Sequence, residues 1–64
     1  MRTAKVIYAE TYRGYRIKYW DTGQAIHFLA SLQTNRGVRE GRHSCETLKE
    51  AIYTAHRFAR GEVE

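Results

Sequence analysis

The chain has 64 residues, 42% hydrophobic and 28% charged, which is the composition of a folded domain rather than of a disordered segment. This length predicts a single domain over residues 1–64 and excludes an architecture with a separate cofactor domain. The lone cysteine, Cys45, excludes a disulfide framework, and because no apolar run has the length of a membrane span we expect no membrane partner.

The formal net charge is +4, and it is unevenly distributed along the chain. Residues 1–45 contain eight basic and three acidic side chains, whereas residues 46–64 contain three basic and four acidic ones. Eight of the eleven cations are arginine, whose planar guanidinium suits bidentate contact with phosphate. The basic excess is consistent with nucleic-acid binding and equally with an ordinary soluble surface of mildly basic charge.

The N-terminal half of the chain has the pattern of antiparallel strands. Residues 5–11 are apolar and β-branched enough for a strand, and residues 12–14 form a turn after them. Residues 15–20 and 26–32 alternate in hydrophobicity on either side of an Asp-Thr-Gly turn at 21–23, which predicts a β-hairpin.

The C-terminal half predicts one more strand and a helix. Asn and Gly favour a second turn at residues 34–37, and the polar residues 38–44 are expected as an edge strand or as a strand ordered by a partner. Thr47 and Glu50 have the spacing of a capping box, and apolar residues then recur at helical spacing, so a helix is predicted over residues 48–60. We therefore predict an α+β domain with a three- to four-stranded antiparallel sheet and one C-terminal helix on one face, either β-β-β-α or the same order with an extra N-terminal strand.

The alternation divides the predicted hairpin into two faces. The side chains expected to point at the helix are Tyr15, Ile17, Tyr19, Ile26, Phe28, Ala30 and Leu32. The opposite face would present Arg16, Lys18, Trp20, His27, Leu29 and Ser31. A face with a tryptophan and a leucine is more apolar than contact with solvent requires.

Four segments, residues 12–17, 21–23, 47–52 and 58–61, together resemble short bacterial proteins of unknown function. The layout is also similar to that of HicB-type antitoxin domains and of the arm-type DNA-binding domains of tyrosine integrases. The resemblance implies a bacterial or phage-borne, cytoplasmic protein, and the integrase likeness implies a sheet laid in the major groove of DNA. Neither likeness assigns a role to a particular residue.

The second face of the hairpin is the first candidate site. Arg16 and Lys18 would contact phosphates, and Trp20 would stack on a base or wedge between bases. Two other interpretations stay open: a partner subunit or the N-terminal segment covers this face, or the face is solvated, with the charged heads of its long side chains in water.

A second candidate site is the segment 35–42, which contains Arg36, Arg39 and Arg42 next to two glycines. Flexible backbone with three guanidinium groups would suit a polyanion such as a phosphate chain. The alternative is a solvated hairpin whose charges protect an edge strand from aggregation.

Catalytic chemistry is not indicated by the sequence. His43 and Cys45 share one face of a strand, but a metal site would need two further ligands, such as His27 and His56, from distant elements. A Cys–His nucleophile would need a cleft that so short a chain hardly offers. We therefore expect no metal, no cofactor and no enzyme.

Two functional hypotheses remain. The leading one is a non-enzymatic module that binds DNA or RNA through the basic sheet face and the arginine-rich turn. The alternative is a protein-interaction module or a homodimer that buries the face containing Trp20 and Leu29.

Overall fold

Four strands and one helix follow one another along the chain in a computed structural model, which describes residues 5–62 of the expected domain 1–64. The elements are β1 (Lys5–Tyr12), β2 (Tyr15–Asp21), β3 (Ile26–Thr34), β4 (Gly37–Cys45) and α1 (Leu48–Ala59). Each strand pairs antiparallel with the next along the chain, so the sheet order is β1-β2-β3-β4. The predicted α+β fold is confirmed, with the N-terminal strand as the fourth member of the sheet and β4 at one edge.

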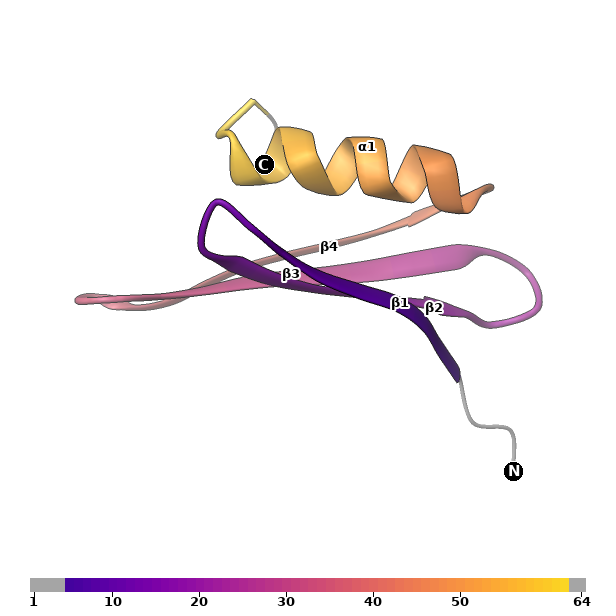
Figure 1. The fold of residues 1–64 in the computed structure, drawn as a ribbon, viewed down its shortest axis with the longest axis horizontal. Helices are drawn as coiled ribbons and strands as arrows, with labels where there is room; N and C mark the ends of the chain where they lie inside the picture. Colours follow the sequence, from indigo (N-terminus) through magenta and orange to yellow (C-terminus); the bar gives the residue numbers. More distant parts are fainter. Residues whose placement is uncertain (1–4, 63–64) are drawn as a thin grey trace.

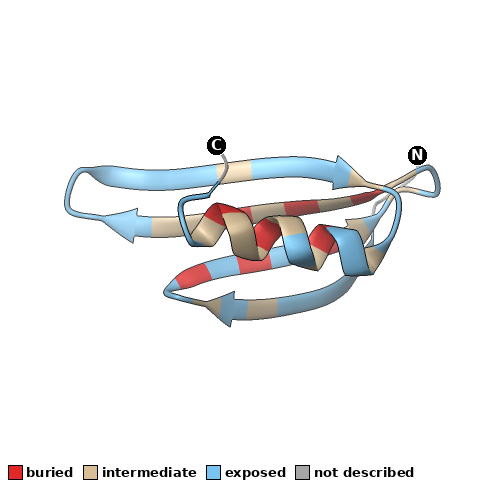
Figure 2. Ribbon diagram, turned by 90° about the horizontal axis from the view of Figure 1, so that it is seen from above, coloured by how far each residue is buried: buried red, intermediate tan, exposed pale blue. Residues whose placement is uncertain are grey.

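The helix lies across one face of the sheet and leaves the other face uncovered by the described residues (Figure 1). The buried residues gather where the helix crosses β2 and β3 (Figure 2). They comprise Tyr15, Ile17, Tyr19, Ile26, Phe28, Ala30, Ala51, Ala55 and Phe58. The expected helix-facing set is therefore confirmed, with Leu32 only partly buried at its end.

The ends of α1 are stabilised by local hydrogen bonds. The hydroxyl of Thr47, the N-cap residue, accepts a hydrogen bond from the backbone N–H of Glu50 at 3.1 Å. At the other end Gly61 has a φ of +82°, and its N–H and that of Glu62 donate to carbonyl oxygens of the last turn. This is the Schellman arrangement that glycine favours, and it ends the helix one residue earlier than predicted.

The turn between β1 and β2 contains only two residues, Arg13 and Gly14, with φ values of 52° and 86°. Two successive positive φ angles match the twist of a tight hairpin. Tyr12, which the sequence suggested for the turn, instead ends β1 and pairs with Tyr15.

Gly41 in β4 makes room for the helix. It pairs with Ala30 of β3, so two small residues lie side by side under Phe58 of α1. A Cβ atom on Gly41 would lie 2.5 Å from the Phe58 ring. The structure confirms the strand predicted over residues 38–44, and Gly41 within it allows close packing instead of supplying the flexible backbone expected of segment 35–42.

A polar cluster connects the edge strand β1 to the helix. Glu10 accepts a hydrogen bond from the hydroxyl of Tyr19 at 2.5 Å, and its Oε2 atom lies 2.9 Å from Nε2 of His56. The ring of Tyr12 stacks on His56 with a centroid distance of 3.8 Å. Burial and the hydrogen bond to Glu10 raise the pKa of Tyr19 above its ordinary value. These contacts hold β1 against α1. Glu10 is the charged residue that β1 contributes to them.

Candidate functional site

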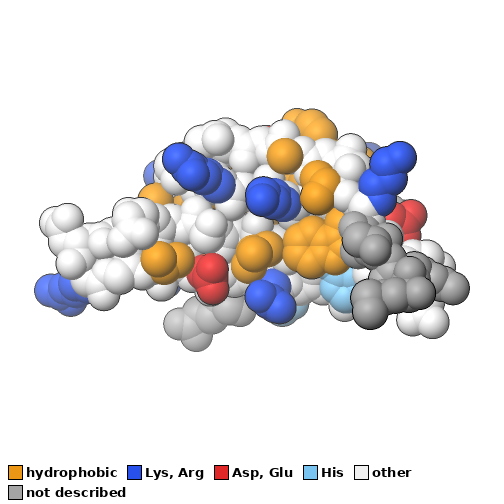
Figure 3. All heavy atoms as spheres, turned by 90° about the horizontal axis from the view of Figure 1, so that it is seen from below, with side chains coloured by type: hydrophobic (Ala, Val, Ile, Leu, Met, Phe, Trp, Pro, Cys, Tyr) orange, Lys and Arg blue, Asp and Glu red, His pale blue; other side chains and the backbone are white. Residues whose placement is uncertain are grey.

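The sheet face opposite α1, here called the open face, contains the first predicted site. Arg16, Lys18 and Trp20 alternate along β2 with the buried core residues, so all three belong to the open face. Arg16 and Lys18 are exposed, and Trp20 is half-buried. Hydrophobic side chains lie between Lys and Arg side chains over this surface (Figure 3).

The strand register arranges these residues in rows across the sheet. Lys18 pairs with Leu29, which pairs on its other side with Arg42, so a leucine lies between two cations. Neighbouring strands are about 4.8 Å apart, which separates the backbones of Lys18 and Arg42 by roughly 10 Å. The two cations can therefore contact separate anionic groups while Leu29 lies between them.

The next row contains an aromatic pair. Trp20 pairs directly with His27, and their rings lie with centroids 6.1 Å apart and an angle of 14° between their planes. Trp20, His27, Arg42 and Ser44 also line a hollow of about 260 Å³. The two aromatic rings thus lie nearly parallel beside a guanidinium and a hydroxyl.

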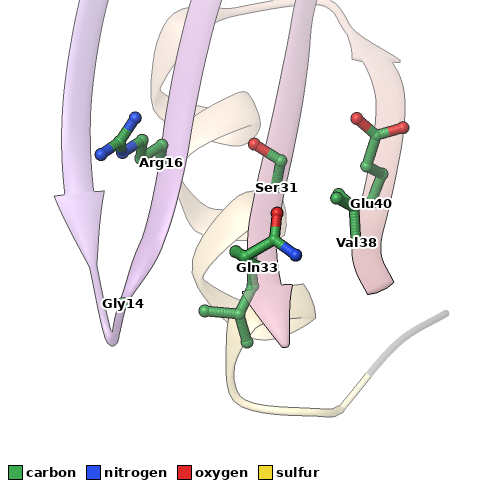
Figure 4. A pocket seen from close by; sticks show the side chains of 7 residues that line it. Gly14, Arg16, Ser31, Gln33, Val38 and Glu40 are labelled. Carbon is green, nitrogen blue, oxygen red and sulfur yellow. The ribbon is translucent and has the colours of Figure 1, made fainter. Parts of the chain in front are cut away.

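A larger hollow of about 600 Å³ lies near the end of the sheet at which the chain turns from β1 to β2. Its lining includes Arg16 on β2, Ser31 on β3 and Glu40 on β4, which follow one another across the strands (Figure 4). Within residues 5–62, Glu40 is the one carboxylate that the register places on the open face. Arg16, Lys18 and Arg42 lie on the same face, so its described residues carry more positive than negative charge.

The three arginines of segment 35–42 do not form one site. Arg36 lies in the turn between β3 and β4, whereas Arg39 and Arg42 lie within β4 on opposite faces of the sheet. The expected arginine-rich turn is therefore wrong in extent, because β4 begins at Gly37 and its alternation separates the arginines.

Arg39 belongs to the helix side of the sheet. Its Nε donates a hydrogen bond to the hydroxyl of Tyr15 at 2.7 Å, and its guanidinium lies 4.8 Å from the centre of the Phe58 ring. A cation held over an aromatic ring in this way contributes to packing. Of the three, only Arg42 joins Arg16, Lys18 and Trp20 on the open face.

Two residues outside the predicted site share with it a face or an end of the sheet. His27 was placed on the open face by its alternation but was not counted as a site residue, and the structure sets its ring beside Trp20. Arg13 lies in the β1–β2 turn, at the same end of the sheet as Arg36, because β1 and β3 run in the same direction. The period of two was enough to place His27 on the open face. The position of Arg13 at the same end of the sheet as Arg36 follows only from the antiparallel order of the strands.

The residues considered for metal binding are dispersed. His43 and Cys45 pair with helix-facing residues of β3, His27 lies on the open face, and His56 contacts Glu10. Across residues 5–62, no group of three or more potential metal ligands lies together. Nor does any helix in this part of the chain have the length and apolar content needed to cross a membrane.

No protein-family model, curated protein or solved structure was found to match this chain. The functional proposal therefore depends on the residues of the open face.

Proposed function

We propose that this domain binds nucleic acid through the open face of its sheet. The observation that carries the proposal is the row in which Lys18 and Arg42 flank Leu29, next to the row that contains Trp20. Cations with apolar and aromatic groups between them suit a ligand with a charged backbone and flat, weakly polar bases.

The cations of the open face are available for such a ligand. The ion pairs within residues 5–62 involve Glu10 and Glu62, and neither carboxylate lies on this face. Arg16, Lys18 and Arg42 are all exposed, so contact with phosphate does not require them to leave a protein carboxylate. When these side chains contact phosphates, they release the counterions condensed there, and the resulting affinity depends on salt concentration.

The experiment is a fluorescence-anisotropy titration of labelled DNA and RNA, single-stranded and duplex, over a range of salt concentrations. For the wild-type domain, log affinity should fall linearly with log salt, by about 0.9 per neutralised phosphate on duplex DNA and about 0.7 on a single strand. Replacing Arg16, Lys18 and Arg42 with glutamine should reduce that slope by up to about 2.7 units on duplex, or about 2.1 on a single strand.

A matched control removes three cations from the other layer of the domain. Replacing Lys49, Arg57 and Arg60 with glutamine changes the net charge equally but leaves the open face intact. The control should keep nearly the wild-type slope. Equal losses in both triple variants would mean that only net charge matters, and no binding of any nucleic acid at low salt would refute the proposal.

A homodimer through the open face is the second candidate function. It is favoured by Val6 and Val38, which the register places on this face and which are 53% and 56% exposed. In that case the molar mass in solution should be twice the 7.5 kDa of the chain, and Val38→Lys should return it to the monomer. A monomeric wild-type domain that binds nucleic acid would exclude this alternative.

A further inference from the structure

We propose that the open face selects single-stranded nucleic acid, with the Trp20–His27 pair as the site on which a base stacks. This inference rests on the proposed function and adds to it the class of ligand and the residues that distinguish it.

The first reason is the geometry of the aromatic pair. Trp20 and His27 are direct cross-strand partners, and the angle between their ring planes is only 14°. Both side chains are partly exposed, so each ring keeps some of its surface accessible. Two near-parallel rings on neighbouring strands offer a surface against which one flat heterocycle can lie.

The second reason is that the two rings are only partly exposed. Trp20 and His27 are both half-buried, so part of each side chain already packs against the protein. A side chain that kinks a duplex has to insert between stacked base pairs, and it has to compensate the energy of unstacking them. A ring that already packs against the protein has less surface to insert between base pairs, whereas the bases of a single strand can turn outward and stack on its exposed part.

The third reason is the position of the cations relative to the two rings. Lys18 and Arg42 lie one row away, and two residues along a strand span about 7 Å. This spacing is comparable to the reach of a nucleotide from its base to its phosphate. A base on Trp20 and His27 therefore has two cations within reach of its flanking phosphates, and both lie in the same neighbouring row, on either side of Leu29.

Trp20 is the only tryptophan of the chain, so its fluorescence reports directly on this site. The experiment titrates the domain with one mixed-sequence strand of about 15 nucleotides and, separately, with the duplex formed by that strand and its complement. Anisotropy of the labelled nucleic acid gives the affinities. The strand should bind more tightly than the duplex and should quench the tryptophan fluorescence.

The variants separate stacking from charge. Trp20→Leu should weaken binding of the strand about 5- to 150-fold and should change duplex binding much less. Trp20→Phe, which keeps a ring, should retain most of the affinity for the strand. Tyr53→Leu removes an aromatic side chain that is 61% exposed on α1, and it should have no effect. Circular dichroism melting checks that each variant is folded.

The outcomes distinguish this inference from the proposed function. If the duplex binds as tightly as the strand, or if Trp20→Leu and Trp20→Phe both bind the strand like the wild type, the stacking site is refuted. The proposed function still stands in that case, provided that removal of Arg16, Lys18 and Arg42 weakens binding. If neither strand nor duplex binds, both proposals fail.

Discussion

Replacing Gly41 with alanine tests how the helix packs on the sheet. Alanine is compatible with the backbone there, because Gly41 is not among the residues with positive φ. A glycine-to-alanine change at such a position ordinarily stabilises a protein by about 0.4–1 kcal/mol, since it restricts the unfolded chain. The new methyl group, however, would lie 2.5 Å from the Cε1 and Cζ atoms of Phe58.

The sign of the effect depends on whether the Phe58 ring can move aside. Phe58 is only 4% exposed, and the ring of Tyr15 packs edge-on against it at a centroid distance of 5.5 Å. Arg39 lies over the same ring. Overpacking so confined a site costs about 1–3 kcal/mol, which exceeds the gain from the unfolded state. We expect a net destabilisation of about 1–2 kcal/mol.

The assay is reversible thermal and urea unfolding followed by circular dichroism. In a domain of this size each kcal/mol lowers the melting temperature by about 4–8 °C, so Gly41→Ala should lower it by roughly 5–15 °C. Glu40→Ala, on the same strand but on the open face, is the control and should change stability by less than about 0.5 kcal/mol.

A second variant identifies the cause. Phe58→Leu shortens the side chain that the new methyl group would meet, so Gly41→Ala should cost less in the Phe58→Leu background than in the wild type. If Gly41→Ala raises the melting temperature, or if its effect is the same in both backgrounds, the contact with Phe58 does not determine the stability cost of a side chain at position 41.

Three further predictions concern the core and the polar cluster. Phe28→Ala should destabilise the domain by about 3–5 kcal/mol, because Phe28 is fully buried, and this should leave little cooperative unfolding to measure by circular dichroism. Glu10→Ala should cost about 1–3 kcal/mol by leaving the buried hydroxyl of Tyr19 without its acceptor, and in urea unfolding it should cost less when Tyr19 is phenylalanine. Because the pKa of Tyr19 is raised in the folded domain, the stability that this provides should be present below pH of about 10 and should decrease above it, as the unfolded chain ionises. Unfolding of Tyr19→Phe over the same pH range should show a smaller decrease.

The hairpin and the helix were predictable because their signals are local. The alternation around residues 15–20 and 26–32 assigned each side chain to a face, and the structure confirms that assignment. Thr47 and Glu50 marked the start of the helix through the spacing of a capping box, and the hydrogen bond from Glu50 to Thr47 confirms it. Each of these signals lies within a few residues and does not depend on what packs against the segment.

The arrangement of the arginines was not predictable to the same extent. The two glycines, Gly37 and Gly41, led to the grouping of Arg36, Arg39 and Arg42 as one flexible site. The strand also predicted over residues 38–44 would have separated Arg39 from Arg42 by its alternation. Gly41 is a strand residue whose absent side chain accommodates Phe58, a contact across 17 positions of sequence. Only the tertiary structure shows that a glycine can serve packing rather than flexibility, and that Arg39 consequently faces the helix.

The pairing of Trp20 with His27 lies between these cases. Alternation placed both residues on the open face, but the registration of β2 against β3 was needed to make them direct partners. The polar cluster of Glu10, Tyr19 and His56 joins residues up to 46 positions apart, and no local pattern indicated it.

The most direct test of nucleic-acid binding by the open face is amide chemical-shift mapping by NMR during titration with a single-stranded oligonucleotide. If the open face binds the oligonucleotide, the shifted signals should belong to Lys18, Leu29 and Arg42 and to the indole N–H of Trp20, while Tyr53 on the outer side of α1 stays unchanged. Shifts confined to the helix, or a spectrum that the oligonucleotide does not alter at low salt, would contradict binding at this face.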